Sequence, residues 1–160
     1  MVATPFFALL FAIIETSIVF FAGQVLETGL QDSARLIFTH QFQDANGALS
    51  VQQQMQKFRD DICPRLIVLF KCEGIEFDVR TYPQGTPITI NDPISGGNYD
   101  NSSFTFQLPS PGSNATVVAR AYYRYPLYVT GLGYNIANIG RGGSDSKRLL
   151  AATAAFHVEP

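Results

Sequence analysis

The chain opens with the stretch that decides its fold: residues 2–26 read VATPFFALLFAIIETSIVFFAGQVL, with Glu15 as the single charge. Crossing the hydrocarbon core of a bilayer takes about 20 residues of helix at about 1.5 Å per residue. Apolar side chains cover every face of such a helix, whereas an amphipathic helix of a soluble protein keeps one polar stripe. We therefore predict a transmembrane helix. A charge near its middle costs about 2.5–3.5 kcal/mol on insertion scales, so Glu15 requires a partner or a protonated carboxyl group.

A cleaved signal peptide is the alternative interpretation of this stretch. No positive charge precedes the apolar run, because the first Lys or Arg of the chain is Arg35. The run is longer than the roughly 7–15 residues of a signal-peptide core, and Glu15 interrupts it. Phe21-Ala22-Gly23 is also a poor cleavage site for signal peptidase. These features favour a retained anchor.

The helix is predicted to continue beyond the membrane. After residue 24 the sequence becomes amphipathic, with apolar residues three or four positions apart at Leu26, Leu30, Ala34 and Ile37. One helix from about Pro5 to Gln43 would be about 60 Å long. We accordingly divide the chain into a transmembrane segment (1–26), an extramembrane continuation of the helix (27–46) and a head (47–160).

The head has room for one small domain. A second helix is predicted over 49–70, capped by Ser50 and interrupted at Cys63-Pro64, because Pro disfavours helical geometry in the preceding residue. Four segments have the pattern of β-strands, at 75–80, 103–108, 115–125 and 149–157. The Gly-, Pro-, Asn- and Ser-rich stretches 83–101 and 127–147 are predicted loops. A helix followed by an antiparallel sheet is an α+β architecture.

Cys63 and Cys72 are the only cysteines, and two interpretations of them stay open. Their spacing is too wide for a Cys-x-x-Cys redox pair, and no His lies near them to complete a zinc site. In an oxidising periplasm they should form a local disulfide that ties the second helix to the first strand, worth about 2–3 kcal/mol. In a cytosolic head they would be two buried thiols.

The composition excludes some functions and offers little chemistry. The net charge is −2, and Lys and Arg are scattered, so no basic surface is available for nucleic acid. The two histidines, His40 and His157, have no nucleophile motif near them. Gly131-Leu-Gly133 and Gly140-Arg-Gly-Gly143 resemble pieces of phosphate loops but do not join a strand to a helix. We therefore expect no enzyme, cofactor, metal or small-molecule substrate.

The N-terminal stretch resembles TadE/TadG-like proteins, the minor pilins or pseudopilins of the Tad (tight adherence, Flp pilus) system. The family pattern is an apolar run that contains a Glu, here Glu15, followed by small residues and Ala-Arg, here Ser33-Ala34-Arg35. Later segments are also similar to rhizobial-type members, at FRDDICPRLIVLFKC, IEFDVRTY, YYRYPLYV and KRLLAATAAFHVEP. The resemblance implies a pilin-like fold and a single-pass protein of the bacterial inner membrane with its head in the periplasm. It also implies other pilin-like subunits and Tad assembly proteins as partners, with assembly and not catalysis as the function.

Two further expectations follow from that resemblance. Family members carry a basic stub, a prepilin-peptidase site and a Glu-Phe pair ahead of the apolar run, so we expect the translation start to lie upstream of Met1. Glu15 is deeper than the Glu of that pair, and we expect it to contact another helix within the membrane.

A rival function is a membrane-tethered periplasmic binding or scaffold protein unrelated to pili. Exposed aromatic residues over 122–125 could serve such a role, whereas packing on a strand face would be their structural explanation.

Overall fold

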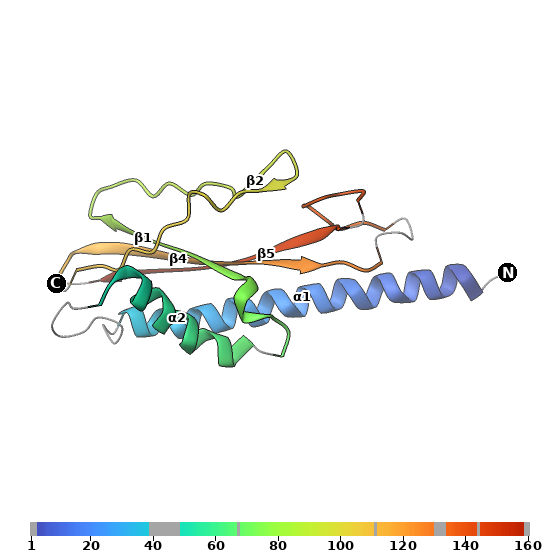
Figure 1. Cartoon of the computed structure of the whole chain (residues 1–160), viewed down its shortest axis with the longest axis horizontal. Coiled ribbons are helices and arrows are strands. Elements are labelled where there is room, and N and C mark those ends of the chain that lie inside the picture. The colour runs from blue at the N-terminus through green and yellow to red at the C-terminus, as the bar shows by residue number, and fades with distance from the viewer. Residues whose placement is uncertain are drawn as a thin grey trace.

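The computed structural model describes residues 3–38, 49–66, 68–110, 112–129, 134–143 and 145–158. A long N-terminal helix, α1 (Ala3–Phe38), runs along a small head and extends beyond it at the N-terminal end (Figure 1). The head comprises α2 (Val51–Leu66), the 3-10 turn η1 (Cys72–Gly74), β1 (Ile75–Pro83), β2 (Ile94–Ser95), β3 (Asn98–Tyr99), β4 (Ala115–Pro126) and β5 (Lys147–Val158). The predicted α+β architecture, a helical spine that carries an antiparallel-sheet head, is confirmed.

α1 is continuous over 36 residues, which corresponds to about 54 Å. Pro5 lies in the first turn, where its missing N–H removes no helical hydrogen bond. The hydroxyl groups of Thr16 and Ser17 donate to the carbonyl oxygens four residues earlier, at 2.7 and 2.8 Å. These polar side chains are therefore satisfied within the helix itself. The predicted continuation through residues 39–43 lies outside the described residues.

α2 begins with a reciprocal cap, as predicted for Ser50. The Ser50 hydroxyl accepts a hydrogen bond from the Gln53 backbone N–H at 3.4 Å, and the Gln53 side chain accepts one from the Ser50 N–H at 2.8 Å. The predicted interruption at Cys63-Pro64 is wrong, because α2 continues through Pro64 to Leu66. Pro64 lies only two residues from the helix end, so its missing N–H disturbs the last turn alone.

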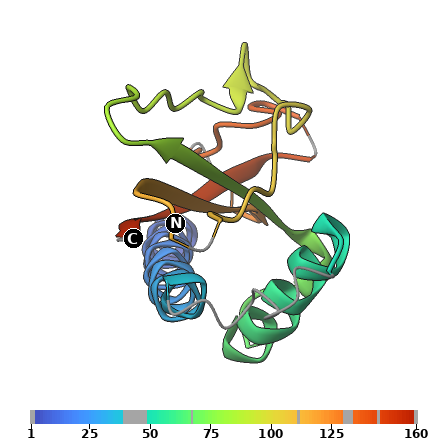
Figure 2. The ribbon, with the colours of Figure 1, turned by 90° about the vertical axis from the view of Figure 1, so that its left-hand side faces the viewer.

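The sheet has three antiparallel strands in the order β1-β4-β5. The register pairs Asp78 of β1 with Arg120 of β4, and Arg120 with Thr153 of β5. Three of the four predicted strands are thus confirmed. Seen along α1, the helices lie on one side of the sheet, with α1 beside β4 and β5 and α2 beside β1 (Figure 2). The long connection from β1 to β4 covers the other side.

The predicted strand over 103–108 is wrong. This segment forms only an isolated bridge between Phe106 and Val79, with two backbone hydrogen bonds of 2.8 Å to the edge of β1. Phe104 stacks on Tyr122 on the outer face of the sheet, whereas Phe106 packs near Phe58 on the helix side. Two residues that are two positions apart in a strand would point to one face. The segment therefore bends around the edge of β1 instead of extending the sheet.

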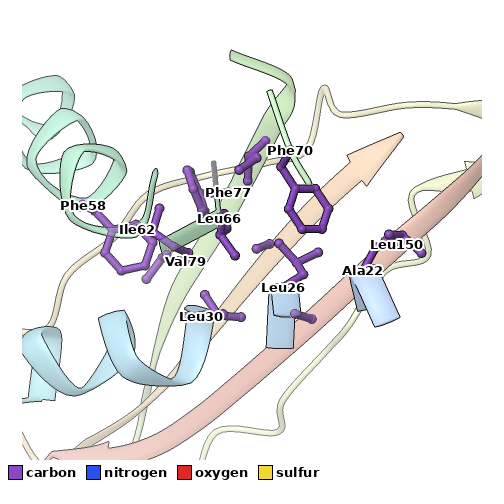
Figure 3. Packing of buried hydrophobic residues seen from close by; sticks show 14 of the residues in the cluster. Ala22, Leu26, Leu30, Phe58, Ile62, Leu66, Phe70, Phe77, Val79 and Leu150 are labelled. Atoms are coloured by element: carbon purple, nitrogen blue, oxygen red, sulfur yellow. The ribbon is translucent and has the colours of Figure 1, made fainter. Parts of the chain in front are cut away.

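Apolar side chains from both helices and from the sheet meet in one core (Figure 3). Leu26 and Leu30 of α1 are fully buried, and they face Ile62 and Leu66 of α2 across the space beneath the sheet (Figure 3). Phe58 meets the ring of Phe77 edge-on, with centroids 5.1 Å apart. The amphipathic half of α1 is thus part of the core of the head.

The outer face of the sheet carries charged residues that the β1–β4 connection covers. Asp78 is fully buried and accepts hydrogen bonds from Arg120, from Arg80 and from the Thr105 backbone N–H. Arg120 is 3% exposed and also donates to the Asn91 carbonyl at 3.1 Å. Because Thr105 and Asn91 belong to the β1–β4 connection, this network fastens the connection to the sheet.

Glu76 forms a second anchor on the same face. Its carboxylate accepts hydrogen bonds from the Tyr99 hydroxyl and the Asn101 side chain, both at 2.7 Å, and pairs with Arg124 at 3.2 Å. Burial raises the pKa of the Tyr99 phenol, and the hydrogen bond to Glu76 raises it further. Tyr99 belongs to the β2–β3 hairpin, whose two-residue turn is Gly96-Gly97 with positive φ at both positions.

Candidate functional site: the apolar helix and its junction with the head

The exposed face of α1 changes character once along its length. Large apolar residues dominate it as far as Phe20 and Phe21, which are 73% and 62% exposed. From Gln24 onward the exposed residues are polar or charged, namely Gln24, Thr28, Gln31, Asp32 and Arg35. Among the described residues, α1 is the one helix long and apolar enough to cross a membrane. The sequence of exposed side chains therefore puts the end of the apolar surface between Phe21 and Gln24.

The opposite face of α1 belongs to the head over much of its length. Its buried residues follow helical spacing from the middle of the helix, at Val19, Ala22, Leu26, Leu30, Ala34 and Ile37. Small residues allow α2 to approach closely, since a Cβ atom on Gly29 would lie 2.8 Å from the Leu66 side chain. Ser33 is fully buried and donates to the Asp61 carboxylate at 2.8 Å. The small-residue part of the Ser33-Ala34-Arg35 pattern thus serves helix–head packing.

Glu15 joins the apolar part of α1 to the head. Its carboxylate accepts hydrogen bonds from the backbone N–H groups of Tyr128, at 2.5 Å, and Val129, at 3.1 Å. Both donors follow directly after β4. The partner that the sequence required for this carboxylate is therefore present within the chain. The predicted contact between Glu15 and another helix stays a prediction.

Packing and membrane boundaries do not coincide on this helix. The predicted transmembrane segment is 1–26, yet the head contacts α1 from Glu15 onward. Residues 3–14, about 18 Å of helix, precede the hydrogen bonds that described residues of the head donate to Glu15. On the face away from the head, the apolar surface continues to Phe21. The division at residues 26 and 27 stays a prediction, and the junction between Glu15 and Phe21 is where head and apolar surface lie side by side.

Cys63 of α2 and Cys72 of η1 form a disulfide, with their Cα atoms 5.6 Å apart. The bond joins the end of α2 to the turn that leads into β1, which is the connection expected for an oxidised head. Both cysteines of the chain are used in it.

The rest of the described residues show little that resembles a reaction centre. No group of three His, Cys, Asp or Glu side chains among them could hold a metal ion. His157 lies 3.3 Å from the Thr116 hydroxyl at the end of the sheet, and His40 lies outside the described residues. Tyr122 is buried beneath Phe104, and Tyr123 packs edge-on against Phe70. Strand-face packing thus accounts for these two aromatic residues.

Sequence reasoning missed two features of the junction. It did not single out Asp61, whose carboxylate accepts hydrogen bonds from Ser33 and Arg65. It also gave Glu15 another helix as its expected partner and no donor within the chain, because the donors are backbone N–H groups more than a hundred residues away in sequence. Every residue except Pro has a backbone N–H group, so residue types do not show which positions donate to a carboxylate in this way.

The described residues thus combine one helix that is apolar enough to span a membrane with a small head into which the C-terminal half of that helix packs. Residues 1–35 match the family model of TadE-like proteins, so the predicted resemblance is confirmed over this segment. The match suggests a component related to the Tad pilus. No match is found among curated proteins or among solved structures.

Proposed function

We propose that this chain is a membrane-anchored, non-enzymatic component of Tad (Flp-type) pilus assembly, a minor pilin or pseudopilin. It lies in the bacterial inner membrane as a single-pass protein with its head in the periplasm. The observation that carries the proposal is the TadE-like match over residues 1–35, which coincides with the exposed apolar surface of α1. An assembly protein needs a surface for its partners, whereas an enzyme needs a convergent pocket of reactive groups.

The partners in this proposal are other pilin-like subunits and Tad assembly proteins, reached through α1. Residues 3–14 precede the hydrogen bonds between Glu15 and the head, and most of their side chains are exposed among the described residues. Phe7 and Phe11 are each 52% exposed on this segment. Helices in a bilayer associate by side-chain packing and by the few polar groups that they carry. The apolar N-terminal turns are therefore the expected site of subunit contact.

Photo-crosslinking in cells tests these contacts. A photoreactive residue at Phe7 should give adducts with other Tad components, whereas the same residue at Val51, which is 51% exposed on α2, should give fewer. A deletion strain should lose pili and surface adherence. Intact pili together with a periplasmic phenotype would support a tethered binding or scaffold protein instead.

The orientation of the head is tested through its cysteines. The charges that flank the apolar run do not decide orientation, because Arg35 lies beyond Glu27 and Asp32. The Cys63–Cys72 disulfide supports an oxidising compartment. Both cysteines should resist alkylation until reductant is added, and a periplasmic reporter fused after Pro160 should be active. Free thiols in freshly lysed cells and a silent reporter would put the head in the cytoplasm and remove the proposal.

Glu15 offers a finer test of helix association. Glu15→Gln keeps an acceptor for the Tyr128 and Val129 N–H groups but removes the charge, whereas Glu15→Leu removes both. If Glu15 contacts a neighbouring helix through its charge, both variants should lose crosslinks from Phe7. If only Glu15→Leu loses them, the carboxylate acts within the chain. Normal assembly and crosslinking by both variants would reject any contact of Glu15 with a partner.

A further inference from the structure

The end of the head that lies beside the apolar part of α1 carries exposed apolar side chains of its own. Tyr128 is 82% exposed and Val68 is 89% exposed. Both line one open groove of about 280 Å³, together with Lys71, Tyr125 and Pro126. We name these five residues the rim. Rim residues come from two segments, after α2 and at the end of β4, that are far apart in sequence.

The position of the rim along α1 is fixed by Glu15. The hydrogen bond from the Tyr128 N–H holds this residue at the level of Glu15, and the end of β4 points toward the N-terminal half of α1 (Figure 1). On the free face of the helix, the apolar surface continues from Glu15 to Phe21. Six residues of helix correspond to about 9 Å. If lipid reaches Phe21, Tyr128 therefore lies about 9 Å deeper than the edge of the apolar surface of α1.

The composition of the rim fits the boundary between lipid headgroups and acyl chains. Tyr is enriched at membrane interfaces because it has an apolar ring and a polar hydroxyl. Lys71 is exposed and is the single charged residue among the described residues that line the groove, so it can reach anionic headgroups. Peripheral elements insert their apolar side chains about 5–10 Å into this boundary, which matches the depth given by α1.

We propose that the rim rests in the lipid interface of the membrane that α1 enters, so that the head is held to the bilayer by two elements and not by its helix alone. The inference rests on the membrane anchoring in the proposed function. It commits to lipid because the hydrogen bond from Tyr128 to Glu15 holds this part of the rim at the level of the apolar part of α1. A second protein seated on the rim is the alternative that the experiment below separates.

The chain has no Trp, so single Trp variants report on one position each. The full chain carrying Tyr128→Trp is reconstituted into vesicles of phosphatidylcholine and phosphatidylglycerol, with or without bromine on the acyl chains. Phe7→Trp reports on the anchor, and Val51→Trp reports on the start of α2 near the C-terminal end of α1 (Figure 1). If the rim is interfacial, Tyr128→Trp should lose roughly half of its emission in brominated lipid, given insertion by about 5–10 Å. Phe7→Trp should lose at least as much, and Val51→Trp should lose almost none.

The outcomes separate two claims, the lipid contact of the rim and the membrane anchoring by α1. Quenching of Phe7→Trp without quenching of Tyr128→Trp overturns the rim inference and leaves the anchor intact. Absence of quenching in both variants overturns the anchor and the rim together. If the indole of Tyr128→Trp is shielded from aqueous acrylamide but not quenched by brominated lipid, the rim contacts protein and the lipid interpretation is overturned. A far-UV circular dichroism spectrum and a cooperative unfolding transition like those of the wild-type chain confirm that each variant has folded.

Discussion

The two faces of the central sheet are covered by different chemistry. On one face, α1 and α2 bury apolar side chains such as Leu26, Ile62 and Phe77. On the other face, the β1–β4 connection is held by the carboxylates of Asp78 and Glu76. These accept hydrogen bonds from arginine side chains of the sheet and from groups of the connection, such as the Thr105 backbone N–H. The helix side is fixed by close packing of many apolar contacts, none of which is directional. The outer side is fixed by a few directional contacts, each of which is costly to lose.

This difference determines what could be recognised in the sequence. β1 alternates apolar and charged residues, which is typical of a strand with one face in water. In the folded chain the charged residues are covered, because each carboxylate finds partners in a segment that lies far along the sequence. The alternation therefore predicts which residues face the helices, but not whether the other face is exposed.

Removing the buried carboxylate of the outer face should have the largest effect. Asp78→Ala leaves the Arg120 guanidinium, 3% exposed, without its ion-pair partner and deprives the Thr105 N–H of its acceptor. Breaking a buried pair in this way costs about 3–5 kcal/mol of unfolding free energy. Denaturant unfolding of the detergent-solubilised chain measures the loss. Limited proteolysis should also cut within the β1–β4 connection of this variant.

A double variant separates the electrostatic effect of the Asp78–Arg120 ion pair from the packing effect of the two side chains. Asp78→Leu with Arg120→Met removes both charges and keeps apolar volume, so part of the lost stability should return. If Asp78→Ala costs less than about 1 kcal/mol, the value of an exposed pair, the outer network is not a structural anchor.

The helix side should respond next most strongly. Ile62 is fully buried beneath the sheet, and Ile62→Ala should lower the unfolding free energy by about 2–5 kcal/mol through lost burial and the cavity left behind. Val51→Ala, at an exposed position of the same helix, is the matched control and should change the free energy by less than about 0.5 kcal/mol. Equal effects of the two variants would mean that α2 does not pack as described.

Periodicity and residue chemistry predicted most of the fold but only part of the site. The long helix, the Ser50 cap and the three paired strands follow from local patterns that tertiary contacts reinforce. The segment 103–108 has an alternating pattern as well, yet it bends around the edge of β1 because Phe104 and Phe106 pack on opposite faces. The Glu15 contact depends on backbone donors, which any sequence could supply. Both the path of 103–108 and the Glu15 contact depend on tertiary packing, which local sequence patterns do not encode.

Two glycines of α1 form a matched pair that sharpens the description of the helix side. Gly29→Ala would put a Cβ atom 2.8 Å from the buried Leu66 side chain, whereas Gly23 has nothing within 4 Å of that position. Overpacking costs about 1–3 kcal/mol, and Ala recovers up to about 1 kcal/mol of helix propensity. Gly29→Ala should therefore lose about 1 kcal/mol net, while Gly23→Ala should be neutral or gain up to about 1 kcal/mol. Thermal unfolding compares them, and the same sign for both would contradict the close α1–α2 approach.

The smallest effect at neutral pH is expected at Tyr99, where the outer face can be probed by titration. Tyr99→Phe removes the hydroxyl that donates to Glu76, which keeps Asn101 and Arg124, so the loss should be about 0.5–1 kcal/mol. The pKa of Tyr99 is raised in the fold, by burial first and by Glu76 second, whereas an unfolded Tyr ionises near pH 10. Stability that depends on the protonated phenol is therefore fully present below about pH 10 and falls as the pH rises above it.

The unfolding free energy of the wild-type chain should thus decline more steeply between about pH 10 and 11.5 than that of Tyr99→Phe. The two proteins share every other tyrosine, including Tyr122 and Tyr125, whose pKa values are also raised by burial, so the difference between their pH curves isolates Tyr99. Denaturant unfolding at each pH provides the measurement. Parallel curves would mean that the Tyr99 hydroxyl is in water, and that the hairpin carrying it is not fastened to Glu76.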